Sequence, residues 1–253
     1  MAFRRFYIDK NEIQDEASLH VKGDLFHHIR DVCRFKVGDQ FEVLNGEPRA
    51  LLYEISQMSN RDLSARKLSE RPLPAPEKPA VTLALSLPKL PKVDWIIEKC
   101  VELGVAEIRP FVSDYSFLRK ASEISPARLT RWQKITEAAT QQSGRGDLLT
   151  VHPAITLEQM LASFNRNPST AGLFPYEGEA QVRLPQAIQE IKKQNPEHLW
   201  LFVGSEGGFS PREVEMFGKH GLKPVSMGSQ ILRVETACVA LVSVIKYECG
   251  ALC

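Results

Sequence analysis

One stretch of the sequence, LWLFVGSEGGFS at residues 199–210, constrains the fold more than any other. Its unbroken apolar run ends in a glycine-rich turn, a pattern typical of a strand that is buried on both faces. Ser210, Pro211 and Glu213 then stand at N-cap, N1 and N3 spacing, which predicts that a helix begins there. We therefore interpret the stretch as a strand, a tight loop and a helix.

The tight loop has the composition of a ligand-binding turn. Gly204, Gly207 and Gly208 allow positive φ angles and let the backbone lie against a ligand without an intervening Cβ. Glu206 adds a charge at the tip of the loop. By itself, such a loop either binds a ligand or only reverses the direction of the chain.

A second strand–loop–helix unit follows within fifty residues. A short strand at Lys223–Met227 precedes a loop at Gly228–Val234, and Glu235 and Thr236 then open an apolar helix at Ala237–Tyr247. In an α/β sheet, ligands usually bind outside the carboxyl ends of the strands. Two glycine loops at this edge therefore favour ligand binding over a simple change of direction.

The composition is that of a globular protein. With 253 residues, 43% of them hydrophobic and 25% charged, the chain can form one large domain or two smaller ones. It has no apolar run long enough to span a bilayer, and its N-terminus, MAFRRFYIDKNE, lacks the apolar core of a signal peptide. We expect a cytoplasmic protein without membrane contact. The five cysteines and the histidines are scattered without metal-ligand spacing, so we expect free thiols and no metal site.

Residues 1–72 are β-rich and predict a small barrel or sandwich. Turn signals separate short extended runs at Phe3–Ile8, Ser18–Val21, Gln40–Leu44 and Ala50–Met58. One helix is expected at Asp24–Phe35, where Leu25, Ile29, Val32 and Cys33 form an apolar stripe.

Proline marks the boundary between two domains. The run Arg71–Pro79 cannot be a helix or a central strand, which predicts an extended linker at residues 73–79. Residues 80–253 then alternate strands and helices, which is typical of a mostly parallel sheet covered on both faces. The expected elements are strands at Val81–Leu87, Ile108–Ser113 and Ala171–Pro175, and helices at Asp94–Leu103, Leu157–Phe164 and Leu184–Gln194, with another capped by Ser125.

The amino-acid sequences of both glycine loops resemble those of a known family. GSEGGFSPRE and MGSQILRVETA look like the paired signature of the RsmE family, SPOUT-class methyltransferases that methylate N3 of a uridine in 16S ribosomal RNA. LPKLPKVDWIIEKCVELGV at residues 87–105 and RWQKITEAATQQSGR at residues 131–145 extend the match in the expected order. The resemblance implies an N-terminal PUA-like β-barrel, a C-terminal SPOUT domain with a trefoil knot, and a homodimer that buries the last helix. It also implies 16S rRNA or the small ribosomal subunit as partner.

The resemblance implies S-adenosylmethionine as the cofactor and the two loops as its site. The sequence lacks G-x-G-x-x-G and G-K-[ST], which removes the usual dinucleotide and nucleoside triphosphate alternatives. The expected cofactor-binding residues are Leu173, Phe174, Val203, Gly204, Ser205, Glu206, Gly207, Gly208, Met227, Gly228, Ile231, Leu232, Arg233, Thr236 and Ala237.

Methylation of uracil N3 requires loss of a proton and stabilisation of the resulting negative charge. Positioning and electrostatics can carry such a reaction without a covalent intermediate. Our hypothesis is that Arg233 or Arg145 stabilises the uracilate, with Glu206 or Glu235 as orienter or base. The alternatives are that Glu235 only caps the last helix and that Arg145 only binds phosphate.

RNA contacts must be local, because 32 basic against 31 acidic residues leave a net charge of only +1. Six cations and two carboxylates lie between Arg119 and Arg145, either as phosphate contacts or as a solvated helix face. Expected RNA-binding residues are Arg4, Arg5, Arg30, Arg34, Lys36, Arg119, Arg128, Arg131 and Arg145.

Four positions depart from the usual family pattern, and the contacts that they concern are those with the substrate. They are Ser205, Gln230, the pair Asp114–Tyr115, and Leu148. Two other classes of protein also remain open, a non-catalytic RNA-binding or ribosome-assembly protein and an α/β enzyme that uses another nucleotide cofactor.

Overall fold

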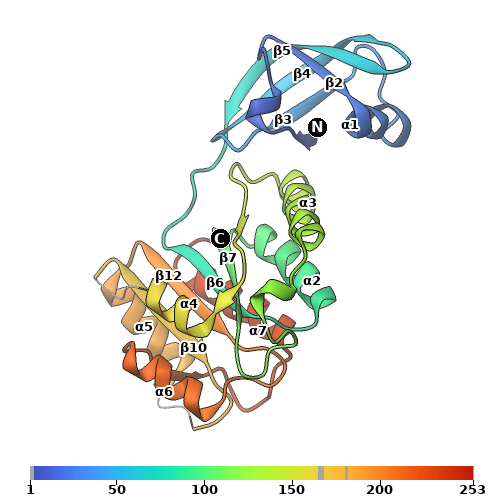
Figure 1. The fold of residues 1–253 in the computed structure, drawn as a ribbon. Coiled ribbons are helices and arrows are strands. Elements are labelled where there is room, and N and C mark those ends of the chain that lie inside the picture. Colours follow the sequence, from blue (N-terminus) through green and yellow to red (C-terminus); the bar gives the residue numbers. More distant parts are fainter. Residues whose placement is uncertain (1–2, 165–167, 180–181, 253) are drawn as a thin grey trace. The chain divides into compact units, whose positions relative to one another are not determined.

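The structure, a computed structural model, describes residues 3–164, 168–179 and 182–252 (Figure 1). The chain divides into two units, one formed by residues 1–75 with 140–148, and the other by residues 76–139 with 149–253. The short segment 140–148 clusters with the N-terminal unit although it is distant from it in sequence.

The N-terminal unit is a curled, mixed five-stranded sheet (Figure 1). The strands, in spatial order, are β1 (Arg4–Tyr7), β3 (Gln40–Leu44), β4 (Arg49–Met58), β5 (Asp62–Pro72) and β2 (Ser18–Lys22). β1 pairs with β3 in parallel, and the other neighbours are antiparallel. Its core packs aromatic rings, among them Phe6, Phe41 and Tyr53, under the curled sheet.

The helix expected at Asp24–Phe35 is shorter and less regular than the apolar pattern suggests. α1 (Gly23–His27) passes directly into a π-helical turn, η2 (His28–Val32), and Arg34 then adopts a left-handed φ of 59° that ends the helix. Phe26 and Ile29 are buried, whereas Val32 is 66% exposed. The expected apolar stripe was therefore wrong at Val32, because the wider π turn rotates this residue out of the core. A short 3₁₀ turn, η1 (Lys10–Glu12), precedes β2.

β5 was not expected as a strand, and it runs into the proline-rich segment. Arg71 and Pro72 pair with Ala50 and Arg49 of β4, so the strand continues up to the residue before the expected linker at residues 73–79. Pro72 is tolerated because β2 pairs with β5 only as far as Arg66, which leaves this end of β5 with a single neighbour.

The second unit contains an all-parallel sheet, which confirms the predicted parallel-sheet class. The strands are β6 (Ala80–Ser86), β7 (Glu107–Val112), β8 (Thr150–Val151), β9 (Ile155–Thr156), β10 (Thr170–Pro175), β11 (Val182–Arg183), β12 (His198–Val203) and β13 (Pro224–Ser226). Their order is β11-β13-β10-β12-β6-β7-β8, and β9 also pairs with β7. β12 therefore lies in the middle of the sheet, with β10 on one side and β6 on the other.

Helices cover both faces of this sheet (Figure 1). Apolar residues of α2 (Leu90–Glu102), α3 (Pro126–Ser143), α5 (Leu184–Gln194) and α7 (Val234–Glu248) join one core cluster. Apolar residues of α4 (Leu157–Ser163) and α6 (Pro211–Lys219) join a second core cluster. The 3₁₀ turn η3 (Ala121–Glu123) precedes α3. Along β12, Leu199, Leu201 and Val203 enter the first cluster and Trp200 and Phe202 enter the second, as the apolar run predicted.

Both ends of the proline-rich segment are anchored. Leu73 is buried against Leu44 and Ala50 of the N-terminal unit. Glu77 lies in the second unit, where its carboxylate is 3.7 Å from Nζ of the buried Lys246 on α7.

Candidate functional site

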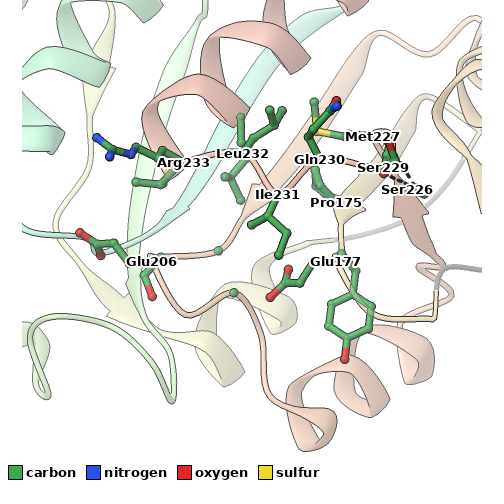
Figure 2. A pocket seen from close by; sticks show the side chains of 18 of the residues that line it. Pro175, Glu177, Glu206, Ser226, Met227, Ser229, Gln230, Ile231, Leu232 and Arg233 are labelled. Atoms are coloured by element: carbon green, nitrogen blue, oxygen red, sulfur yellow. Dashed lines mark hydrogen bonds between the residues drawn. The ribbon is translucent and has the colours of Figure 1, made fainter.

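A cavity of about 370 Å³ opens at the carboxyl ends of β10, β12 and β13 (Figure 2). The turn after β12, the loop after β13 and the first turn of α7 form its walls. The two glycine loops therefore meet at one hollow, as their positions in the sequence predicted.

Most of the expected cofactor-binding residues line this cavity. They are Val203, Gly204, Ser205, Glu206, Gly208, Met227, Gly228, Ile231, Leu232, Arg233 and Ala237. Four others lie outside the lining. Leu173 and Phe174 are buried in the two cores, Thr236 is exposed on α7, and Gly207 contacts Tyr115 on the other side of the turn.

The turn after β12 requires glycine at two positions for different reasons. A Cβ on Gly204 would lie 2.9 Å from backbone atoms of Gly208, because the turn closes on itself through the hydrogen bond from Gly208 N–H to Ser205 O. Gly208 has a φ of +66°, and a Cβ there would lie 2.0 Å from Oε1 of Glu177. The carboxylate of Glu177 therefore lies directly against the glycine turn.

The lining includes residues that the sequence analysis did not select. They are Lys92, Pro175, Tyr176, Glu177, Ser226, Ser229, Gln230 and Val234. Glu177 projects into the space between the two loops, opposite Ile231 (Figure 2). It follows the carboxyl end of β10, so the sheet-edge rule points to it once β10 is known to lie beside β12.

Lys92 connects two candidate catalytic carboxylates. Its Nζ lies 3.3 Å from Oε1 of Glu206 and 3.1 Å from Oε2 of Glu235. Lys92 stands in the first turns of α2, Glu206 in the turn after β12, and Glu235 in the first turn of α7. One ammonium group therefore links three separate elements around the cavity.

These ion pairs set the protonation states of the site. Burial alone would lower the pKa of Lys92, but its hydrogen bonds to Glu235 and Glu206 raise it above the ordinary lysine value. Burial alone would raise the pKa of Glu206, but the backbone N–H groups of Glu206 and Lys89 and the ammonium of Lys92 together lower it. At neutral pH Glu206 is therefore ionised and a weak base, which favours an orienting role over proton abstraction.

The two candidate arginines differ in their surroundings. Arg233 is the N-cap residue of α7, lines the cavity and has an exposed side chain with no carboxylate partner in the part of the chain that the structure describes. Arg145 belongs to the segment that clusters with the N-terminal unit, and its guanidinium is paired with the carboxylate of Asp147.

Three of the four departures from the family pattern lie near the glycine turn. The hydroxyl of Ser205 donates to the backbone oxygen of Tyr115 at 2.7 Å, so two of the departures contact each other. Asp114 is held by Arg212 and by the capping residues of α6, and Gln230 lines the cavity. Leu148 lies in the segment that clusters with the N-terminal unit.

Several side chains that were expected to bind RNA instead form ion pairs or hydrogen bonds within the protein. Asp94 on α2 pairs with both Arg128 and Arg131 and also accepts a hydrogen bond from Trp132 Nε1, an arrangement that holds α3 on α2. Arg5 pairs with Glu42, and Arg30 pairs with Asp31. Arg119 donates to a backbone oxygen of Asp114. Arg4, Arg34 and Lys36 are exposed, and within the described residues their side chains have no carboxylate partner.

Four of the cysteines lie in the described part of the chain, namely Cys33, Cys100, Cys238 and Cys249, and all four are free thiols. Burial raises the pKa of Cys238 well above its ordinary value. Over the same residues, no helix is both long and apolar enough to cross a bilayer. A search of these residues found no cluster of three or more His, Cys, Asp or Glu side chains suited to a metal ion.

A parallel sheet with two glycine loops enclosing a cavity at its carboxyl edge defines an α/β protein with a site suited to a small ligand. Comparison with known families makes the class specific. The family model of the RNA methyltransferase domain matches residues 76–246, and the model of the RNA methyltransferase PUA domain matches residues 21–68. The chain therefore belongs to the RNA methyltransferase family.

Individual relatives confirm the resemblance to RsmE. Ribosomal RNA small subunit methyltransferase E of Synechocystis is 31% identical over 227 residues, which cover 88% of this chain and 70% of the relative. The Bacillus subtilis protein of the same name is 28% identical, with 97% and 96% covered. The crystal structure of the Neisseria gonorrhoeae enzyme, bound to S-adenosyl methionine, superposes with a TM-score of 0.83 at 25% identity and covers 97% of this chain and 98% of that chain.

Proposed function

We propose that the protein is an S-adenosylmethionine-dependent methyltransferase that methylates N3 of a uridine in 16S ribosomal RNA of the small subunit. The observation that carries this proposal is that both family loops line one and the same cavity at the carboxyl edge of the sheet. The relatives add support, because they are small-subunit rRNA methyltransferases and the Neisseria enzyme binds S-adenosyl methionine.

The cavity fits this cofactor in size and in chemistry. Its volume of about 370 Å³ lies within the range of small-molecule sites, roughly 300–1,000 Å³. Backbone groups of the two loops would hold the adenine, with Ile231 and Leu232 as apolar walls. Ile231 is 85% exposed in this structure, so it would gain apolar contact with a bound cofactor. Glycine at position 208 keeps open the space beside Glu177, which the side chain of any larger residue would fill.

The charged residues then divide the catalytic tasks. When bound, S-adenosylmethionine supplies an electrophilic methyl group on its sulfonium. Arg233, which lines the cavity and has no carboxylate partner among the described residues, would stabilise the negative charge that develops on the uracil as the N3 proton passes to solvent water. Glu206 and Glu235, both held by Lys92, would fix the positions of the loop and of α7.

The proposal extends to the fold and assembly that the family implies. The N-terminal sheet would complete a PUA-like barrel that binds RNA, and the C-terminal loops would form a trefoil knot. α7 would lie in a homodimer interface, where the exposed Val244 and Tyr247 become covered. The enzyme would work in the cytoplasm on rRNA or on the small subunit, without a metal ion or a membrane. Light scattering tests the dimer directly.

Two measurements test the proposed activity. Calorimetry should show binding of S-adenosylmethionine by the purified protein, and mass-spectrometric mapping of 16S rRNA from a deletion strain should show one uridine that has lost its N3 methyl group. No binding of the cofactor would favour a non-catalytic RNA-binding protein. A different nucleotide carried through purification would favour another α/β enzyme.

A further inference from the structure

Two large aromatic side chains are exposed in the loop that follows β7. Tyr115 is 49% exposed and Phe117 is 53% exposed, with only the buried Ser116 between them. Two large aromatic side chains exposed within three residues of one loop are more than the single, scattered apolar residues that are normal on a protein surface. Neither ring belongs to the lining of the cavity described above.

The backbone that carries these rings is held rigidly. Asp114 donates its N–H to Oε1 of Glu213 at 2.8 Å, and its carboxylate accepts a hydrogen bond from Arg212 at 2.7 Å. The arginine holds the pKa of Asp114 below its ordinary value. Phe117 N–H donates to Leu87 O at 2.8 Å. The loop therefore presents its rings from a fixed frame, which reduces the entropy lost when a ligand binds.

The loop is joined to the wall of the cavity. The hydroxyl of Ser205, a lining residue, donates to Tyr115 O at 2.7 Å. A Cβ placed on Gly207 would lie 2.8 Å from Cβ of Tyr115, so the tyrosine packs directly on the glycine turn. The exposed ring of Tyr115 therefore lies against the outer side of the turn whose inner side faces the cavity.

Cationic side chains continue the same loop. Arg119 and Lys120 follow Phe117 within three residues, and both are exposed. The Nη1 of Arg119 donates to Asp114 O at 2.6 Å, which places its guanidinium beside the aromatic segment. Aromatic rings next to cations are the combination by which proteins bind single-stranded nucleic acid, through base stacking and phosphate contacts.

We propose that the loop at residues 114–120 is a platform for single-stranded RNA, in which Tyr115 stacks on an unpaired nucleobase and Arg119 contacts the adjoining phosphate. The proposal rests on the proposed function, because it assigns the RNA side of that site. The hydrogen bond from Ser205 to Tyr115 then couples the platform to the cofactor turn.

Three variants at one position test the stacking role. Tyr115→Leu keeps an apolar side chain but removes the ring, and should weaken binding of single-stranded RNA, and raise the KM for small subunits, by about 5- to 150-fold. Tyr115→Phe keeps the ring and should restore binding to within about twofold of the wild type. Tyr115→Trp should show indole quenching on addition of oligouridylate, but not of duplex RNA, beyond any quenching of the wild type, which already contains three tryptophans. S-adenosylmethionine affinity should be the same in all three.

Each contrary outcome is distinct. Equal RNA affinity of the leucine and phenylalanine variants, or no quenching of the tryptophan variant, would overturn the stacking role. A loss of binding to intact subunits without any loss to naked rRNA would instead show that the loop contacts a ribosomal protein, which also overturns it. Fluorescence quenching does not depend on methyl transfer, so absence of methylation by the wild-type protein would contradict the proposed function alone.

Discussion

A single lysine holds the charges of the candidate site together. Lys92 touches Glu206 and Glu235, which come from the turn after β12 and from α7. The three side chains are only partly buried, so solvent weakens the attraction within each ion pair. The main effect of the lysine is therefore to hold the turn and α7 in position around one shared cation. The carboxylates would repel each other without this ammonium.

We expect Lys92→Met to lower the rate of methyl transfer by about tenfold or more, because the turn and α7 lose their common partner. The acid limb of the pH–rate profile should also move to higher pH. The ammonium of Lys92 is one of the groups that lower the pKa of Glu206, so its removal lets this carboxylate protonate at a higher pH. Lys89→Met is the matched control, because only the backbone of Lys89 contacts Glu206. An unshifted acid limb would contradict this role.

Arg233 and Arg145 should behave differently although both were candidates for charge stabilisation. Arg233→Ala should lower the single-turnover rate at saturating cofactor by about 10²- to 10³-fold, because the developing charge on the uracil loses its partner. Arg145→Ala should leave the rate at saturating RNA largely unchanged, since Arg145 is paired with Asp147. If both variants keep the wild-type rate while RNA binding is intact, neither arginine stabilises the uracilate.

The carboxylate of Glu42 makes the stability of the N-terminal sheet depend on pH. Its side chain is almost fully buried and accepts two hydrogen bonds from Arg71, at 2.6 and 2.8 Å, which lower its pKa. A lowered folded-state pKa contributes stability above the ordinary glutamate pKa, and this contribution is lost as the pH falls through the lowered value. Glu42→Gln should therefore cost about 1.5–3 kcal/mol at pH 7 and reduce the loss of stability on acidification. Thermal melts between pH 7 and pH 3 check both effects, and equal pH dependence in the two proteins would contradict them.

At the scale of elements, the turn after β12 depends on the space at Gly208. Gly208→Ala forces a side chain into a left-handed conformation and against Glu177, so we expect at least a tenfold loss of S-adenosylmethionine affinity in calorimetry. Gly218→Ala is the control, because Gly218 lies within α6 with open space around its Cβ position. This control should keep cofactor affinity and gain about 0.5–1 kcal/mol of stability. Wild-type affinity of Gly208→Ala would show that the turn does not contact the cofactor.

The elements that the sequence predicted well are those whose ends are marked by residues close together in the chain. Ser210 caps α6 and forms a capping box with Glu213, as their spacing indicated, and α5 has the predicted bounds. The strand β5 was missed because its outward positions are charged and only Leu63 and Ala65 point into the core. Glu177 was missed for a different reason. Its importance depends on β10 lying next to β12, a pairing between distant segments.

At the scale of the whole molecule, the chain divides into two units, and the place of one short segment in them has no local signal in the sequence. The proline-rich segment marks the change from a β-rich part to an α/β part. That residues 140–148 cluster with the N-terminal unit depends on contacts between distant segments, such as Arg5 close to Gly144 and Leu73 close to Gly146. Propensities and periodicity act over a few residues and contain no information on such contacts.

The most direct test of the account is transfer of a labelled methyl group to its proposed acceptor. Small subunits from a deletion strain, incubated with the protein and deuteromethyl S-adenosylmethionine, should yield labelled N3-methyluridine at one position of 16S rRNA by mass spectrometry. The Gly208→Ala variant should yield much less of it under the same conditions. Label on another base or another atom, or no label on either naked rRNA or subunits, would contradict the account.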